Sequence, residues 1–126
     1  MSVTAAVSDA RWRRAFVVGL TMLVGSLLPS PLARHEAFDT YGPDKWLHFL
    51  GHGAFTVTLA DAVAGEEVAP IPAAGAAVGG SVALALVVSA LQQYVPGRVP
   101  ELADTVAGTL GSVAGVGWWY RAVVED

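Results

Sequence analysis

The stretch "DKWLHFLGHGAFTVTLADAV" (residues 44–63) has the length of a membrane-crossing helix but carries charges that such a helix rarely contains. At 1.5 Å per residue, its 20 residues span about 30 Å, close to the hydrocarbon thickness of a bilayer. Asp44, His48 and His52 are spaced i, i+4 and i+8, and therefore share one helix face, with Lys45 beside them. An ionisable group at membrane depth costs several kcal/mol unless it faces protein or water. The stretch therefore predicts a polar site inside a helical bundle.

The composition places the chain with membrane proteins. Of its 126 residues, 54% are hydrophobic and 14% are charged, whereas roughly a quarter of the residues in a soluble domain are charged. The absence of cysteine excludes disulfides and thiolate metal sites. A net charge of −4 without a dense basic run argues against nucleic-acid binding.

Three further apolar spans predict an all-α fold, a bundle of four transmembrane helices with antiparallel up-down topology and short loops. We expect helices over residues of about 14–29, 45–64, 73–92 and 102–120. Pro29 and Pro31 end the first span, because each removes a backbone donor. The whole chain, 1–126, is then one integral-membrane domain with the lipid bilayer as its partner.

Basic and aromatic residues indicate the orientation in the cell membrane. Arg11, Arg13 and Arg14 flank Trp12 just before the first apolar run, which favours a cytoplasmic N-terminus. Four crossings then place the C-terminus in the cytoplasm as well. An alternative is a cleaved signal peptide with its apolar region at residues 15–28, which would leave the other three spans unchanged.

Glycines supply the small surfaces through which membrane helices approach one another. Gly108, Gly111 and Gly115 fall on one helix stripe, and Gly75 with Gly79 forms a G-x-x-x-G pattern. We expect these faces to pack within the chain. A homo-oligomer joined through the glycine-rich faces is the alternative.

The predicted fold brings a second set of polar residues, from the connection between the third and fourth spans, to the end of the bundle where we expect Asp44, Lys45 and His48. Under the four-crossing topology, the connections before the second and fourth spans reach the same outer membrane face. Gln92, Arg98 and Asp104 lie in or beside the second of these connections, and we expect them to meet the first group.

The motifs "DKWLHF" and "QQYVPGRVPELADTVAGTLGSVAG" resemble the VanZ-like family of small multi-pass membrane proteins. The family pattern falls on Asp44, Lys45, His48, Phe49, Gln92, Arg98, Asp104 and Gly111. Two positions depart from it: Ser89 stands where the family usually has glutamate, and Gly108 where it usually has asparagine. The resemblance implies a role in the cell envelope and, in the namesake, low-level glycopeptide resistance, but no known reaction and no cofactor.

Three interpretations of the polar residues remain open. In the first, Lys45 and Arg98 bind an anionic lipid headgroup or a lipid-linked envelope precursor, helped by the other polar residues. In the second, His48 with Asp104 or Asp44 is the acid/base pair of an enzyme that acts on a lipid or lipid-linked phosphate. In the third, the cluster only holds helices together, with one acid paired to Arg98 and the other to Lys45.

A metal site built on His48, His52 and a carboxylate is a weaker alternative, because i, i+4 histidines can share an ion. The chain has no H-E-x-x-H motif and no thiolate ligand. We expect no metal, and we expect His52 to lie between helices with a backbone carbonyl as its partner.

Overall fold

Four helices and no strands make up the described part of the chain, which confirms the all-α prediction. The structure, a computed structural model, describes residues 2–27, 43–95 and 102–125. The helices are α1 (Val3–Leu27), α2 (Pro43–Ala64), α3 (Pro70–Gln92) and α4 (Leu102–Glu125).

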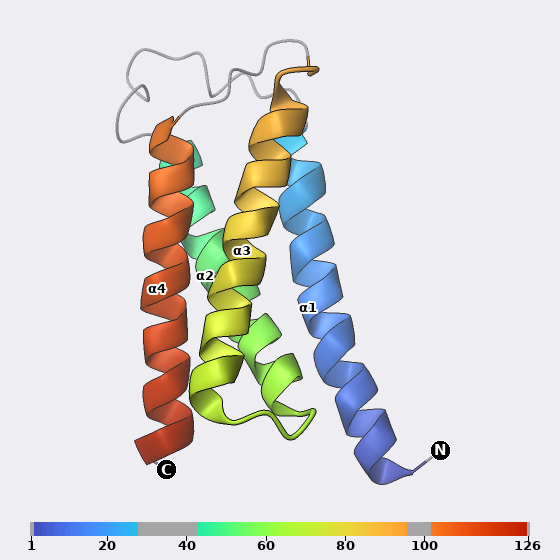
Figure 1. Cartoon of the computed structure of the whole chain (residues 1–126). Coiled ribbons are helices and arrows are strands. Elements are labelled where there is room, and N and C mark those ends of the chain that lie inside the picture. Colours follow the sequence, from blue (N-terminus) through green and yellow to red (C-terminus); the bar gives the residue numbers. More distant parts are fainter. Residues whose placement is uncertain (1, 28–42, 96–101, 126) are drawn as a thin grey trace.

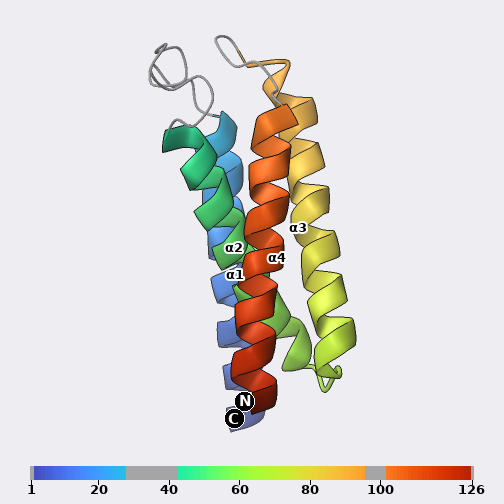
Figure 2. The same ribbon diagram turned by 90° about the vertical axis from the view of Figure 1, so that its left-hand side faces the viewer.

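Successive helices run in opposite directions, so the bundle has two distinct ends (Figure 1). The chain termini and the turn between α2 and α3 lie at one end, called here the termini end. The starts of α2 and α4 and the finish of α3 lie at the other, called the site end. Helix α2 contacts all three other helices, and its largest interface is with α4. Helices α1 and α4 hardly touch: they lie at opposite sides of the bundle in Figure 1, and after a turn of 90° α4 stands in front and α1 lies behind (Figure 2).

Helix α1 begins at Val3 instead of the predicted residue 14. Ser2 caps it, because the backbone N–H of Ala5 donates to the Ser2 hydroxyl at 3.1 Å. The added turns also make tertiary contacts. The Ser8 hydroxyl and the Trp12 indole N–H both donate to one carboxylate oxygen of Glu66, at 2.6 and 2.9 Å. The early residues are therefore part of the bundle.

The other helices also extend beyond their predicted ends. Helix α3 begins at Pro70, where a proline costs little because the first helical N–H has no partner within the helix. Helix α4 continues to Glu125 instead of ending near residue 120. The turn between α2 and α3 contains Glu67 at φ 64°, a left-handed conformation that follows the last helical turn.

The glycine stripe on α4 packs against α2, as predicted. A side chain at Gly111 would overlap the backbone carbonyl of Phe49, and a Cβ at Gly115 would lie 2.6 Å from the carbonyl oxygen of Gly53. A Cβ at Gly108 would lie 2.7 Å from Cδ2 of His52. These three glycines therefore allow α2 and α4 to approach closely.

The G-x-x-x-G pattern on α3 does not pack within the chain, and that prediction was wrong. Gly75 and Gly79 are exposed, and a Cβ at either position would meet nothing within 4 Å. Helix α3 instead turns Ala73 and Ala77 toward α2 and α4, where they form a small core with Ala60 and Trp119. A spacing of four recurs on every face of a helix, so the motif alone does not identify the packed face.

The distribution of side chains is the reverse of that in a water-soluble bundle. Eight polar or charged side chains are buried among the described residues, as many as the apolar ones, and six of those eight apolar ones are alanine. Large apolar side chains are exposed on all four helices, for example Phe16, Leu50, Leu86 and Leu110.

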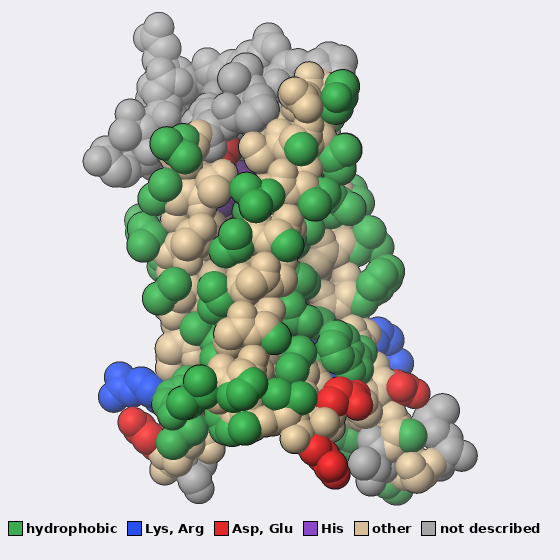
Figure 3. Space-filling model, in the orientation of Figure 1, with side chains coloured by type: hydrophobic (Ala, Val, Ile, Leu, Met, Phe, Trp, Pro, Cys, Tyr) green, Lys and Arg blue, Asp and Glu red, His purple; other side chains and the backbone are tan. Residues whose placement is uncertain are grey.

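On the face in Figure 3, charged side chains gather at the termini end and apolar side chains cover the flanks. By length and composition, α3 is the one described helix that could cross a membrane.

Candidate functional site

Two basic side chains on α2 converge on one carboxylate of α4 at the site end. Lys45 and His48 lie one helical turn apart and so share a face of α2. Asp104 lies in the first turn of α4, where the helix dipole stabilises a negative charge. Lys45 Nζ lies 3.0 Å from Asp104 Oδ1, and His48 Nε2 lies 3.5 Å from Oδ2. We call Lys45, His48 and Asp104 the ionic clasp.

The ionic clasp is almost completely buried. The side chains of Lys45 and His48 are each 10% exposed, and that of Asp104 is 12% exposed. The contact between Lys45 and Oδ1 of Asp104 has the distance of an ion pair, although its angles are not those of a hydrogen bond. Charge attraction, strengthened by the low dielectric of the interior, is therefore the main interaction between these two groups.

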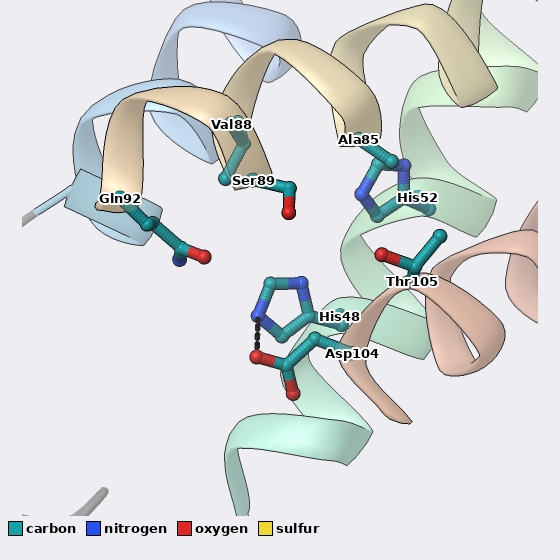
Figure 4. A pocket seen from close by; sticks show the side chains of 8 residues that line it. All are labelled: His48, His52, Ala85, Val88, Ser89, Gln92, Asp104 and Thr105. Carbon is teal, nitrogen blue, oxygen red and sulfur yellow. Dashed lines mark ion pairs between the residues drawn. The ribbon is translucent and has the colours of Figure 1, made fainter. Parts of the chain in front are cut away.

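A small cavity lies beside the ionic clasp. Its lining residues are His48, His52, Ala85, Val88, Ser89, Gln92, Asp104 and Thr105. Figure 4 shows the Ser89 hydroxyl and the Gln92 amide directed toward the ring of His48. The cavity volume of about 10 Å³ is near the smallest that holds one water molecule. We call the ionic clasp together with Ser89 and Gln92 the polar site.

Gln92 also joins the polar site to α1. Its amide Nε2 donates to the backbone carbonyl of Ser26 at 2.9 Å, near the last turn of α1. The Gln92 side chain is buried, and this bond satisfies one orphan carbonyl at a helix end. Part of its hydrogen-bonding capacity therefore has a structural use.

A chain of buried hydroxyls continues from His52 toward the middle of the bundle. The rings of His48 and His52 are stacked, with centroids 6.2 Å apart. Nδ1 of His52 lies 2.8 Å from the Ser81 hydroxyl, which lies 2.6 Å from the Ser112 hydroxyl. Ser112 in turn donates to the carbonyl of Gly108 at 3.0 Å. Helices α2, α3 and α4 are thus joined by polar contacts at a depth where the outer surface is apolar.

Four of the six predicted ligand-binding residues meet around this cavity or at its edge: Lys45, His48, Gln92 and Asp104. Arg98 lies outside the described residues, and so does the side chain of Asp44, whose backbone belongs to α2. The predicted pairing of an acid with Lys45 is present, with Asp104 as the acid.

Some of the site was not predicted. The partner of His52 is the Ser81 hydroxyl, so the expected backbone carbonyl was wrong. Ser81 and Ser112 were missed altogether. The signal for them was weak, since a single serine in an apolar helix often bonds only to its own backbone. Among the described residues, no three histidine or acidic side chains lie close enough to hold a metal ion, so the metal alternative gains no support.

Comparison of the chain with protein-family models, with curated proteins and with solved structures gave no match. The resemblance to the VanZ-like family therefore stays a prediction.

Proposed function

We propose that the protein is a multi-pass membrane protein whose four helices cross the bilayer, with the polar site facing outward to bind the anionic tip of an amphiphilic envelope component. The reversed burial pattern supports the membrane placement, because lipid favours apolar outer faces and allows a polar interior. Without a bilayer, the exposed apolar side chains of all four helices would form patches typical of an aggregating protein.

The modest hydropathy of α2 is compatible with a membrane span. His48, His52 and Thr56 lower its mean hydropathy, and all three are buried inside the bundle. Its outer face carries Trp46 and Leu47. The surface that α2 would present to lipid is thus more apolar than its average composition.

Basic residues support the orientation of the bundle. Arg11, Arg13 and Arg14 lie in the N-terminal half of α1, and Arg121 lies in the last turns of α4, which favours a cytoplasmic termini end. The polar site then lies at the outer edge of the membrane. We propose that the protein is VanZ-like because of the motifs quoted above and because of where two positions of the family pattern lie in the structure.

The two positions that depart from the family pattern are Ser89 and Gly108, and their locations support the VanZ-like proposal. Ser89, in place of the usual glutamate, lines the cavity beside His48. Gly108, in place of the usual asparagine, lies against the ring of His52. Ser89 belongs to the polar site, and His52 lines the same cavity, so the two positions where the family pattern has a polar side chain both lie at or next to this cavity.

The observation that carries the binding proposal is the burial of two basic groups around one carboxylate at helix ends. His48 adds a second positive charge when it is protonated, so the ionic clasp can then attract an anion despite Asp104. The cavity accepts about one water-sized group, so a ligand would insert a single oxygen and keep its remainder outside the helices. A phosphate at the tip of a lipid fits this requirement.

A binding experiment in nanodiscs tests the proposal. We expect wild-type protein to retain a polyprenyl phosphate and to release the matching polyprenol. The double variant Lys45→Gln/Asp104→Asn removes both charges without leaving one of them buried alone, and we expect it to lose retention. Glu125→Gln, in an exposed pair at the other end, is the control. Equal retention of phosphate and alcohol, or unchanged retention by the double variant, would exclude the proposal.

A purely structural ionic clasp is the second candidate, favoured by the small size of the cavity and the 3.0 Å contact between Lys45 and Asp104. It predicts lower stability of Asp104→Asn and no retention of the polyprenyl phosphate by any form of the protein. Release of inorganic phosphate from the same lipid would favour the enzyme alternative, with His48 as the acid/base group.

A further inference from the structure

A much larger cavity lies at the termini end, away from the polar site. Its volume is about 320 Å³, within the range of small-molecule sites and far above the 10 Å³ of the cavity in the polar site. Its lining residues come from α1, α2 and α4: Arg11, Arg14, Val57, Thr58, Asp61, Trp118, Trp119, Ala122 and Val123. The cavity lies over α2, between α1 and α4, because these two helices make almost no contact with each other.

The wall that α1 contributes is positively charged. Arg11 and Arg14 are one turn apart and share a face of the helix. Arg11 contacts Asp61 twice. Nε of Arg11 lies 3.7 Å from Oδ2 of Asp61, and Nη1 of Arg11 donates to the backbone carbonyl of Asp61 at 3.4 Å. Arg14 is exposed and makes no ion pair with any acidic side chain in the described ranges. Two guanidinium groups and the single carboxylate of Asp61 thus line the cavity, and Arg14 is available to an anion.

The opposite wall is apolar and aromatic. Val57 on α2 and Val123 on α4 line it together with Trp118, whose side chain is largely exposed. Tryptophan and arginine side by side are typical of the headgroup level of a bilayer. The cavity therefore combines an anion-binding wall with a surface suited to the first carbons of an acyl chain.

We propose that this cavity binds an anionic phospholipid of the cytoplasmic leaflet, with the headgroup phosphate at Arg14 and Arg11 and an acyl chain along Val57 and Val123. Arginine suits this role because its planar donors can bind two phosphate oxygens at once. Basic cavities between helices on the cytoplasmic side are a common setting for anionic headgroups. The inference rests on the membrane placement and orientation proposed above, and is independent of what the polar site binds.

Native mass spectrometry of the full chain released from nanodiscs tests this site. In discs of mixed phosphatidylglycerol and phosphatidylcholine, we expect one phosphatidylglycerol to stay bound per chain. Arg14→Gln removes a charge-assisted contact worth about a tenfold loss of affinity or more. Arg13→Gln makes the same charge change on the same helix outside the cavity, and we expect it to retain the lipid.

A second variant tests the cavity itself. Ala122→Trp fills it from an exposed position of α4, so the bundle should still fold, and we expect the phospholipid to be lost although both arginines remain. The double variant at Lys45 and Asp104 should retain phosphatidylglycerol, which separates this site from the polar site.

Three results would overturn the proposal. Equal losses from Arg13→Gln and Arg14→Gln would indicate diffuse surface charge. Equal retention of the two phospholipids would show that charge is not recognised. Displacement of phosphatidylglycerol by millimolar glycerol phosphate as readily as by another anionic phospholipid would indicate a site for a free phosphate.

Discussion

Asp104 is the residue on which the polar site depends. Its carboxylate meets Lys45 and His48, and all three side chains are largely withdrawn from solvent. Removing one member of such a group takes a charge partner from a group that stays in a poorly solvated place, whereas removing both members of a pair does not. A variant that removes both members of a pair therefore separates an effect on ligand binding from an effect on stability better than a single variant does.

We expect Asp104→Asn to lower the free energy of unfolding in mixed micelles by about 3–5 kcal/mol, because the buried ammonium group of Lys45 loses the carboxylate that lies 3.0 Å from it. The double variant Lys45→Gln/Asp104→Asn should recover a large part of that loss. Glu125→Gln serves as the control, because its pair with Arg121 is exposed and such pairs contribute little. An equal loss in the single and double variants would contradict the ion-pair assignment.

At the scale of single residues, the sequence predicted which residues form the polar site better than it predicted which atoms they contact. The positions of Lys45 and His48 near the start of the second span and of Asp104 near the start of the fourth, together with the up-down topology, were enough to bring these three residues to one end. The partner of His52 was wrong, because hydroxyls on α3 and α4 are identified only once the relative rotation of three helices is known. Ser81 reaches His52 through that rotation, which no local pattern encodes.

At the scale of helices, close packing between α2 and α4 depends on glycine. The backbone of Phe49 lies directly over Gly111, so neither surface can move aside without shifting a helix. On the same helix, Gly117 is exposed, and a Cβ there would meet nothing within 4 Å. The two positions therefore form a matched pair.

Gly111→Ala should lower the free energy of unfolding by about 1–3 kcal/mol, the usual cost of overpacking. Gly117→Ala should be neutral or stabilise by up to about 1 kcal/mol, because alanine has the higher helix propensity. Equilibrium unfolding in mixed micelles measures both. Equal effects at the two positions would mean that α2 and α4 do not approach at Gly111.

Helix α1 is attached to the α2–α3 turn by a contact that should depend on pH. Hydrogen bonds from Ser8 and Trp12 lower the pKa of Glu66 below its usual value. Because that pKa is lower in the folded protein, the contact contributes its full stability above the ordinary glutamate pKa of about 4.3. The contribution is lost as the pH falls through the folded-state value.

Thermal unfolding between pH 7 and pH 3 measures this dependence. Wild-type protein should unfold at a higher temperature than Glu66→Gln at pH 7, and the difference should shrink as the pH falls below the ordinary glutamate pKa. Glu67→Gln changes the neighbouring acid, which is exposed, and should follow the wild type. A difference between wild type and Glu66→Gln that stays the same from pH 7 to pH 3 would show that the ionised carboxylate is not responsible.

The sequence predicted the number and order of the helices because long apolar spans between proline-rich breaks are strong signals. It missed the first turns of α1, where Ser8 and Trp12 bond to Glu66, a residue more than fifty positions away. It also misplaced the packed face of α3. Both errors concern tertiary contacts, which local patterns do not contain.

At the scale of the whole molecule, the buried side chains are mostly small or polar, whereas many large apolar side chains are exposed. Thr56, Ser81 and Ser112 are the largest side chains that are completely buried in the described part of the chain. Such an interior provides little hydrophobic stabilisation in water. Crossing of a bilayer by all four helices explains both halves of this pattern, and it is the central proposal here.

Labelling of single cysteines in intact cells tests that proposal most directly, and the chain contains no native cysteine to interfere. Glu67→Cys at the α2–α3 turn and Gln93→Cys after α3 lie at opposite ends of the bundle, and both positions are exposed. A membrane-impermeant maleimide added outside should label Gln93→Cys at once and Glu67→Cys only after the membrane is opened. Labelling of both from outside, or recovery of the protein in the soluble fraction, would contradict a four-helix crossing with the polar site facing outward.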